Sequence, residues 1–400
     1  MGKHERTPPE PQVLVEHAER SYARDAADNL LIHGDNLHAL HALRETHAGS
    51  VRCVYIDPPY NTGAAFEHYH DDLGHAAWLS FMRERLQPLL PLLRDDGVLF
   101  CSIDDREHAY LTVLLDELFG RDNRCGTLVW EKKKKPSFLD ASMGAVTEYV
   151  LAYAKDRRRA PPFIGGVTTA GKKYPLNNAG NGRRVLRFPA GSVRFSCGDQ
   201  TFEPQDMSEG NIVTCLLDRL VVDGGRNVGA FRLEGEWRYS QARLDELLAR
   251  GEAIVISKAP FRPNHVKDGG EPKKLKNLLS IAHYGMSTYE DATAESVALF
   301  GESAAFDYPK PEKLIATLLG AVTRPGDLVL DSFAGSGTTG AVAHKLRRRW
   351  IMIERGDHAV THVAPRLRKV VDGEDRGGVS AAAGWSGGGG YRFYRLSPTR

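Results

Sequence analysis

Short apolar runs and helically spaced apolar positions alternate along the first 155 residues of the chain. Runs of mostly β-branched or aromatic side chains, which predict strands, lie at 30–33, 51–56, 97–103, 127–130 and 147–154. Apolar residues at helical spacing, which predict helices, lie at 37–46, 75–93 and 106–119. Strands that alternate with helices in this way predict βαβ units and a parallel sheet.

The pattern changes after Lys155 and returns near Tyr308. Residues 156–270 are rich in glycine, arginine and asparagine, with short strand-like pieces and one predicted helix at 241–250, which indicates an inserted α+β region. The second α/β block carries predicted helices and strands at 312–322, 327–330, 338–346, 350–353 and 357–370. We therefore expect a doubly wound, mostly parallel sheet built from 26–155 and 271–375, with a loose arm at 1–25 and a flexible glycine-rich linker and short strand at 376–400.

Composition narrows the class of protein only a little. A hydrophobic content of 42% can bury a large core, and no run of about 18 apolar residues is long enough to span a membrane. The polar, proline-rich start lacks the apolar segment of a secretory signal. Five scattered cysteines without a Cys-x-x-Cys pair indicate reduced thiols in a cytosolic protein and no zinc site. The net charge of +2 leaves nucleic-acid binding open.

The strand predicted at 51–56 leads into an unusual loop. It ends on Asp57, and the next residues, Pro58 and Pro59, have no N–H with which to continue a ladder. Tyr60 follows them. A carboxylate, two stiff backbone carbonyls and an aromatic ring are thus expected at the C-terminal tip of a strand, where ligands bind in open α/β sheets.

A glycine-rich turn follows the strand predicted at 327–330. The segment Asp331–Gly340 contains a Gly-x-Gly-x-x-Gly match and leads into a predicted helix. A match between a strand and a helix indicates a site where backbone N–H groups approach a ligand. Glu354 ends the next predicted strand about twenty residues later, where an acid can bind a ribose diol. Taken alone, this turn is typical of a dinucleotide-binding oxidoreductase.

Together, the two motifs resemble those of the DNA amino-methyltransferases, which use S-adenosylmethionine. Asp57–Tyr60 looks like the catalytic motif of that family and Asp331–Gly337 like its cofactor motif, in the order of the permuted β group. The similarity is closest to the modification subunits of type III restriction systems. It covers residues 55–63, 96–105, 148–155, 306–311, 331–340 and 389–396.

This resemblance implies a role for each part of the chain. Residues 26–155 would form the catalytic half of a Rossmann-like methyltransferase core, 156–270 the target-recognition region and 271–375 the cofactor-binding half. The residues that would line or close over S-adenosylmethionine are Tyr308, Pro309, Lys310, Asp331, Phe333, Ala334, Gly335, Ser336, Gly337 and Thr338, with Glu354 on the ribose. Asp35 is the candidate for the adenine ring of the cofactor, and a helix-capping role is its alternative.

The implied reaction is methyl transfer to the N6 amine of adenine in duplex DNA, in the cytoplasm and at the nucleoid. An exocyclic amine is a poor nucleophile because its lone pair is delocalised into the ring. Asp57 and the Pro58 carbonyl can accept its two N–H bonds, and Tyr60 offers a face on which a flipped base can stack. The sulfonium methyl is already activated, so its alignment with the nitrogen is most of the catalysis, and no metal is needed.

Two basic runs are candidates for phosphate contact, and solvated surface is the ordinary alternative for both. They are expected beside the catalytic face and consist of Lys132, Lys133, Lys134 and Lys135, and of Arg157, Arg158 and Arg159.

Rival interpretations remain at this point. They are methylation of the N4 amine of cytosine, a nicotinamide-dependent oxidoreductase, and a non-catalytic DNA-binding protein with a methyltransferase fold. The chain is short for a type III modification subunit, which disfavours a restriction partner and favours a solitary methyltransferase. A homodimer is an expectation of the resemblance alone.

Overall fold

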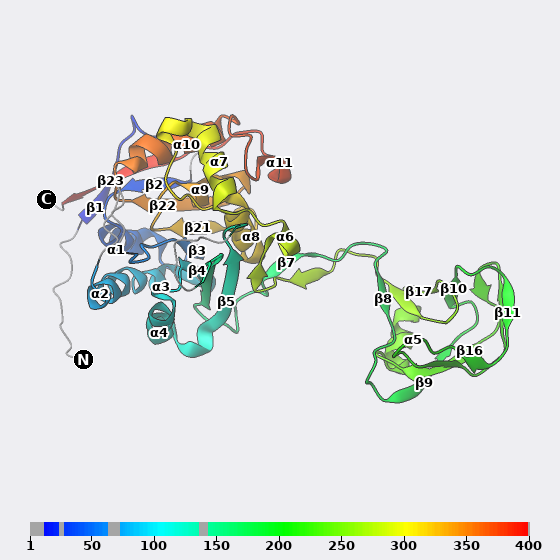
Figure 1. Ribbon diagram of the computed structural model, residues 1–400. Coiled ribbons are helices and arrows are strands. Elements are labelled where there is room, and N and C mark those ends of the chain that lie inside the picture. Colours follow the sequence, from blue (N-terminus) through cyan, green and yellow to red (C-terminus); the bar gives the residue numbers. More distant parts are fainter. Residues whose placement is uncertain (1–11, 24–27, 63–72, 136–142, 399–400) are drawn as a thin grey trace. The chain divides into compact units, whose positions relative to one another are not determined.

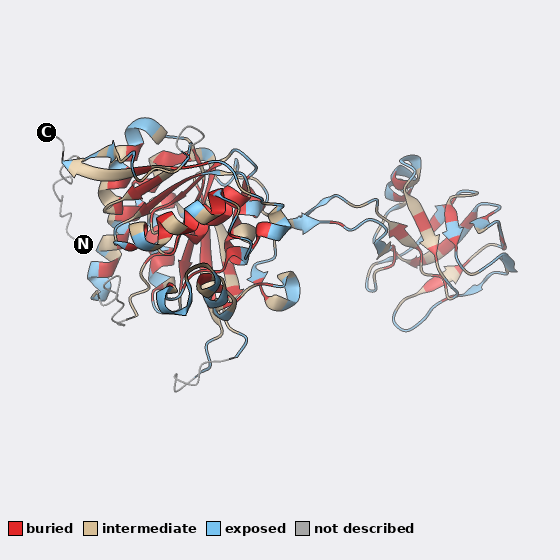
Figure 2. Ribbon diagram, turned by 90° about the horizontal axis from the view of Figure 1, so that it is seen from above, coloured by how far each residue is buried: buried red, intermediate tan, exposed pale blue. Residues whose placement is uncertain are grey.

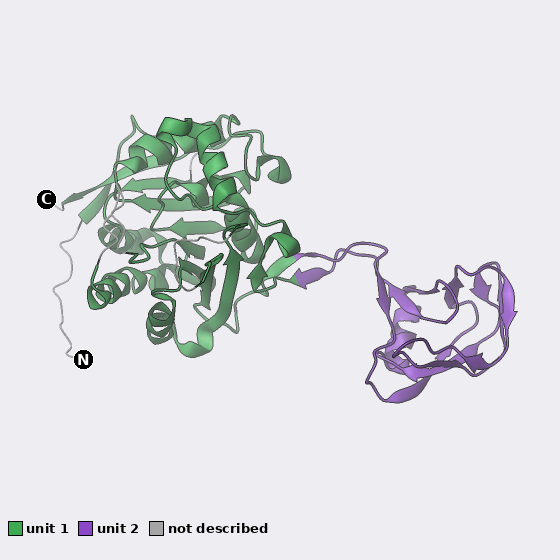
Figure 3. Ribbon diagram, viewed as in Figure 1, with its two compact units in different colours: residues 1–165, 274–400 green, residues 166–273 purple. Residues whose placement is uncertain are grey.

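The computed structural model describes residues 12–23, 28–62, 73–135 and 143–398. The chain forms two compact units (Figure 3): unit 1 comprises residues 1–165 and 274–400, and unit 2 comprises residues 166–273. Residues 156–165, which we expected in the inserted region, belong to unit 1. Their place is explained by Phe163, whose ring contacts Phe100 of the large sheet edge to face at 5.5 Å.

Unit 1 contains a ten-stranded sheet in the order β1-β23-β2-β22-β21-β3-β4-β6-β5-β20 (Figure 1). In that order the strands are β1 Gln12–Glu16, β23 Arg392–Pro398, β2 Leu30–His33, β22 Arg349–Glu354, β21 Leu328–Asp331, β3 Val51–Ile56, β4 Leu93–Ile103, β6 Thr147–Ala154, β5 Arg124–Glu131 and β20 Leu278–Leu279. Neighbours are parallel except that β1 pairs antiparallel with β23, and β6 pairs antiparallel with both β4 and β5. The expectation of a mostly parallel sheet is confirmed.

Helices cover both faces of this sheet, because successive side chains of a strand point to opposite faces. In β3, Cys53 and Tyr55 enter one core, whereas Val54 and Ile56 enter the other. The second core includes side chains of α1 Asn36–His47, α2 His75–Leu86, α3 Leu89–Leu92 and α4 His108–Phe119. The first includes side chains of α8 Glu312–Val322, α9 Thr338–Lys345 and α10 Ala364–Val371. Buried residues accordingly concentrate on the strands and the inner sides of these helices (Figure 2), so the sheet is doubly wound.

The remaining helical elements of unit 1 are short or lie at its margin. They are η2 Arg121–Asn123, α6 Ile281–Tyr284, α7 Tyr289–Phe300, η3 Glu302–Ala304, η4 Ala359–Val363 and α11 Ser380–Ala383. The helix expected at 357–370 therefore begins as a π-helical turn, η4, before it continues as α10. The helix expected from Arg106 begins at His108.

Both ends of the chain depart from the expectation. Residues 12–16 were expected in a loose arm, yet they form β1, which pairs with β23 from Gln12–Pro398 to Glu16–Tyr394 while Leu14 packs on the core. The glycine run before β23 is not a flexible linker. Gly388 N donates to Val371 O at 2.7 Å, and Gly390 O accepts from the side-chain amide of Asn29 at 2.8 Å. Glycine permits this close course, since a Cβ on Gly390 would lie 2.3 Å from the Ala23 carbonyl oxygen.

Unit 2 has its own aromatic core, which includes Trp237, Phe188 and Phe231. Its seven-stranded sheet contains β11 Gln200–Phe202, β14 Leu220–Asp223, β15 Arg226–Asn227, β10 Val193–Phe195, β17 Ala253–Ile256, β18 Asn264–Val266 and β8 Lys173–Pro175. Its four-stranded sheet contains β12 Gln205–Asp206, β13 Thr214–Leu216, β16 Phe231–Glu236 and β9 Arg183–Phe188. The helix α5 is Gln241–Ala249, and the pair β7 Ile164–Val167 and β19 Pro272–Lys274 spans the junction of the two units.

The described residues contain neither a candidate membrane-spanning helix nor a candidate metal-binding cluster. None of their helices has the length and apolar character that a membrane crossing requires. Nor do their His, Cys, Asp and Glu side chains form a group of three or more that could hold a metal ion.

Candidate functional site

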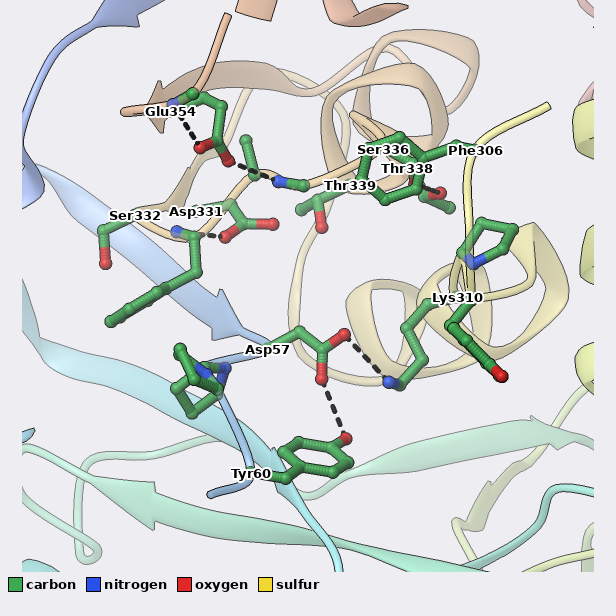
Figure 4. Close-up of a pocket in the computed structure, with 18 of the residues that line it drawn as sticks. Asp57, Tyr60, Phe306, Lys310, Asp331, Ser332, Ser336, Thr338, Thr339 and Glu354 are labelled. Carbon is green, nitrogen blue, oxygen red and sulfur yellow. Dashed lines mark hydrogen bonds and ion pairs between the residues drawn. The ribbon is translucent and has the colours of Figure 1, made fainter. Parts of the chain in front are cut away.

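Four carboxylates meet at one edge of the large sheet, because the parallel strands β2, β22, β21 and β3 end there side by side. They are Asp35, Glu354, Asp331 and Asp57, and all four line one cavity of about 970 Å³ (Figure 4). Of the other residues expected in the site, those that also line it are Pro58, Pro59, Tyr60, Lys132, Lys133, Tyr308, Pro309, Lys310, Phe333, Ala334, Gly335, Ser336 and Thr338. The catalytic and cofactor motifs, more than 270 residues apart in the sequence, therefore share one cavity.

The glycine turn has the backbone that its sequence predicts. Gly335 and Gly337 have φ angles of +53° and +78°, in the left-handed region that favours glycine. Gly337 does not line the cavity, and a Cβ at this position would lie 3.0 Å from a methyl carbon of Val363. α9 begins at Thr338, so the N–H groups of its first turn lie at the cavity.

Hydrogen bonds fix the two carboxylates on either side of this turn. Asp331 accepts from Phe333 N at 2.9 Å, and its burial raises the pKa of this carboxyl to about 7. Glu354 accepts from Gly335 N at 2.8 Å and from Gly356 N at 2.9 Å. Burial opposes ionisation of Glu354, but these bonds and the nearby His358 outweigh it, so the pKa of Glu354 is lowered.

Asp35 performs the capping role that was its alternative, and it also lines the cavity. Its carboxylate accepts from Leu37 N at 2.9 Å at the start of α1 and forms an ion pair with Arg85 at 3.2 Å. The Arg85 guanidinium stacks over Phe81 at 3.7 Å from the ring centroid, and Phe81 meets Phe333 edge to face at 6.3 Å. These rings form an aromatic wall beside Asp35.

The loop after β3 is held from several sides. The indole N–H of the buried Trp78 donates to Pro59 O at 2.8 Å. Asn61 has a φ of +61°, and its amide donates to Glu107 at 2.8 Å. A non-glycine residue in the left-handed region costs on the order of 1–3 kcal/mol, and these contacts offset that strain. The loop therefore presents Asp57 and Tyr60 in a fixed arrangement.

Both carboxylate oxygens of Asp57 are engaged (Figure 4). Tyr60 OH donates to Asp57 Oδ1 at 2.8 Å, and Lys310 Nζ donates to Asp57 Oδ2 at 2.8 Å. Lys310 was expected over the cofactor, but its ammonium points to the Asp57 carboxylate. Burial disfavours the charged ammonium, yet the charges of Asp57 and Glu148 outweigh it and raise the pKa of Lys310.

Glu148 is a further buried carboxylate, for which no role was predicted from the sequence. Tyr289 OH donates to both of its oxygens, at 3.1 and 2.9 Å, and Lys132 Nζ donates to Oε1 at 3.1 Å. Glu148 is the second residue of β6, whose reversed direction brings its start to the edge of the sheet where β4 ends. The other cavity residues not named from the sequence include Asn36, Tyr55, Asp104, Phe306, Asp307, Ser332, Thr339 and Arg355.

The structure separates the two basic runs. In the first run, Lys132 binds Glu148, Lys133 lines the cavity, and Lys134 forms an ion pair with Asp291 at 3.2 Å; Lys135 is exposed. Residues 157–159 follow the other end of β6, at the opposite edge of the sheet, so their expected position beside the catalytic face is wrong. Arg158 and Arg159 form ion pairs there with Asp156 and Asp95. The reason is the antiparallel direction of β6, which the alternation of strands and helices does not reveal.

A buried ionic network supports the cofactor motif from behind. Arg366 donates to Thr338 Oγ1 at 2.8 Å and to Ser336 O at 3.3 Å, and it pairs with Glu312 at 2.9 Å. Lys345, which is fully buried, pairs with Glu312 and with Asp375, both at 2.8 Å. Because Glu312 lies two residues after Lys310, the network joins the glycine turn to the segment that carries the lysine.

A doubly wound α/β sheet with a glycine turn and carboxylates at its strand ends defines a protein that binds a nucleotide-derived ligand. The DNA methylase family model matches residues 51–364, more than half of the sequence, and the chain belongs to this family of N6/N4 methylases.

Two curated relatives and one solved structure illustrate the similarity. A probable type III restriction-modification enzyme HindVI Mod subunit from Haemophilus influenzae is 31% identical over 93% of this chain and 54% of its own length. The type II methyltransferase M.KpnI from Klebsiella pneumoniae is 28% identical over 87% of this chain and 86% of its own. The PvuII cytosine-N4-specific DNA methyltransferase structure covers 86% of this chain and 87% of its own at 16% identity, with a TM-score of 0.45. The expected resemblance to type III modification subunits is confirmed, although this chain spans about half the length of the HindVI relative.

Proposed function

We propose that this chain is a site-specific DNA methyltransferase that transfers the methyl group of S-adenosylmethionine to the N6 amine of adenine. The observation that carries the proposal is that the Asp57 loop and Gly335 of the glycine turn line one and the same cavity. Membership of the DNA methylase family and similarity to type III Mod subunits support it. An oxidoreductase would leave the Asp57–Tyr60 loop without a task.

The cavity residues fit S-adenosylmethionine. Asp331 and Glu354 offer acceptors for its ammonium and ribose groups, and the wall of Phe81 and Phe333 suits an adenine ring. Ser332 Oγ is buried at this wall and finds no hydrogen-bond partner among the described residues, so a polar ligand can satisfy it. When bound, the cofactor would supply an activated methyl group on a sulfonium centre.

The residues of the Asp57 loop would prepare the amine. Asp57 accepts one N–H bond and the Pro58 carbonyl the other, which draws the nitrogen towards tetrahedral geometry and directs its lone pair at the methyl group. The ring of Tyr60 gives a surface for a base that has left the duplex, an extrusion that costs a few kcal/mol. Lys133 at the cavity wall is a candidate phosphate contact.

Mass spectrometry of nucleosides tests the proposed reaction directly. The purified protein is incubated with S-adenosylmethionine and genomic DNA free of methylated adenine, and the DNA is then digested to nucleosides. We expect N6-methyldeoxyadenosine. N4-methyldeoxycytidine in its place would overturn the adenine assignment, and absence of both products would overturn the proposed function.

Binding of the methyl donor should depend on pH through Asp331. With a pKa of about 7, this carboxyl is protonated at pH 6 and ionised at pH 8, and only the ionised form attracts a cationic ligand. The affinity for S-adenosylmethionine is therefore expected to rise between pH 6 and pH 8 by several-fold, up to the roughly tenfold change in the ionised fraction. Isothermal titration calorimetry at both pH values measures this rise.

The matched variant is Asp331→Asn, which keeps the shape of the side chain and cannot ionise. It should bind S-adenosylmethionine more weakly than the wild type at pH 8, and with little change between pH 6 and pH 8. A variant that retains the full pH dependence would show that another group is responsible.

A further inference from the structure

The Lys310 ammonium lies between two carboxylates on the target side of the cavity. Its side chain is only 6% exposed, and Nζ donates to Asp57 Oδ2 at 2.8 Å and to Tyr289 OH at 2.9 Å. The same nitrogen lies 3.7 Å from Glu148 Oε2. The rings of Tyr60, Tyr289 and Trp130 surround the ammonium, with centroids 5.0–5.9 Å away. Lys310 is thus held beside the reacting position by both charge and aromatic faces.

At its observed position Lys310 works against the proposed reaction. The amine needs Asp57 as an acceptor, but Tyr60 OH already occupies Oδ1 and the ammonium occupies Oδ2. Positive charge builds up on the amine nitrogen while it takes the methyl group, and a cation bonded to Asp57 weakens the stabilisation that this carboxylate can give. A pocket that is ready for transfer therefore needs the ammonium elsewhere.

Glu148 offers the ammonium a second position. Its carboxylate is 4% exposed, and Tyr289 OH lies within hydrogen-bond distance of both Lys310 and Glu148. Closing the 3.7 Å gap to hydrogen-bond length requires a shift of about 1 Å, which rotation of the lysine side chain supplies. Pro309 and Pro311 flank Lys310 and restrict its backbone, so the movement is confined to the side chain.

The cluster stays electrically neutral in either position. Two carboxylates, Asp57 and Glu148, face two ammonium groups, Lys310 and Lys132. Passing Lys310 to Glu148 leaves Asp57 without a cation, but the Asp57 side chain is 27% exposed and keeps the hydrogen bond from Tyr60 OH, so the cost is smaller than for a fully buried charge. In the second position, the incoming amine takes the place of the ammonium on Asp57.

We propose that Lys310 is a positioning residue that holds the Asp57 carboxylate in its orientation before the target arrives and passes to Glu148 when the target amine reaches Asp57. The proposal rests on the proposed function, since it assigns a task to residues around the amine. Glu148 is then the residue that releases the catalytic acceptor. Tyr289 guides the ammonium between the two carboxylates.

A double-mutant cycle tests this transfer. Glu148→Gln removes the charge that draws Lys310 away, so kcat for DNA methylation is expected to fall at least tenfold, while KM for S-adenosylmethionine stays within about twofold. In the Lys310→Met background no cation has to move, and Glu148→Gln should lower kcat less than threefold. In the Lys310→Arg background the cation remains, and the full loss should return.

The split between kcat and KM and the return of the loss with Lys310→Arg are readouts that a purely structural role would not move. Lys313→Met, an exposed lysine on α8, is the control and should leave kcat unchanged. If Lys310→Met fails to bind S-adenosylmethionine, Lys310→Gln replaces it in the cycle.

The outcomes separate this proposal from the proposed function. If the wild type methylates DNA but Glu148→Gln causes the same loss with and without Lys310, the transfer of Lys310 is overturned alone. If the wild type methylates no DNA at all, the proposed function fails first. A loss confined to backgrounds that keep a cation at position 310 supports the proposal.

Discussion

Asp57→Asn is expected to reduce methyl transfer at least about 100-fold, the scale on which one preorganised polar group contributes to a transition state. The amide of asparagine carries no charge, so it cannot stabilise the positive charge that builds up on the target amine. It can also turn its own NH₂ group, a donor, towards the amine nitrogen whose N–H bond Asp57 would accept. It also leaves Lys310 without its 2.8 Å ion-pair partner. Transfer of a radiolabelled methyl group to DNA at saturating S-adenosylmethionine measures the effect. Asp57→Ala should abolish transfer for the same reason.

Binding of S-adenosylmethionine should survive both changes, because the cofactor residues belong to β21, β22 and the glycine turn rather than to the Asp57 loop. Calorimetry on each variant checks this point. Asp122→Asn, on an exposed residue of η2, is the matched control and should methylate DNA at the wild-type rate. A variant Asp57→Asn that methylates at the wild-type rate would remove Asp57 from the mechanism.

Lys345→Met is expected to lower the free energy of unfolding of unit 1 by about 3–5 kcal/mol, as is usual when one partner of a buried ion pair is removed. Methionine occupies a similar volume, so the loss reflects charge rather than a cavity. Glu312 would keep only Arg366 as its positive partner, and Asp375 would lose its ion pair with Lys345. Urea denaturation followed by tryptophan fluorescence measures the change, fitted with a transition for each unit because each has its own core.

Arg83→Met provides the comparison, because Arg83 forms an ion pair with Glu117 in which both side chains are about half exposed. Screening by water makes such a pair worth no more than about 1 kcal/mol. If both variants lost the same free energy of unfolding, burial would not increase the contribution of the Lys345 ion pairs to stability. Weaker binding of S-adenosylmethionine by Lys345→Met would show, in addition, that the network supports the glycine turn.

The parts of the site at the C-terminal ends of the parallel strands could be predicted from the sequence. Asp331 and Glu354 end their strands and Asp57 directly follows its strand, and parallel strands place such residues at one edge of a sheet. The glycines of the turn have positive φ angles, which the residue type itself indicates. Local pattern and chain order are sufficient for this half of the site.

The other half depends on information that local pattern does not contain. Glu148 begins a strand and Tyr289 begins a helix 141 residues later, and only the reversed direction of β6 and the return of the chain after unit 2 bring them together. The same reversal carries residues 157–159 to the opposite edge of the sheet. Whether a short apolar strand runs parallel or antiparallel is set by its partner strands. Neither position could therefore be derived from the residues of β6 alone.

The position of β23 between β1 and β2 governs how the protein can assemble during synthesis. Gln12 pairs with Pro398, and β2 also pairs with β23, so β1 and β2 expose an open edge until β23 leaves the ribosome. At roughly 5–20 residues per second this interval lasts tens of seconds. Unit 2 can fold meanwhile on its own core, whereas the nascent sheet of unit 1 remains exposed to non-native strand pairing. The yield of correctly folded protein therefore depends on protection of that edge until β23 is available.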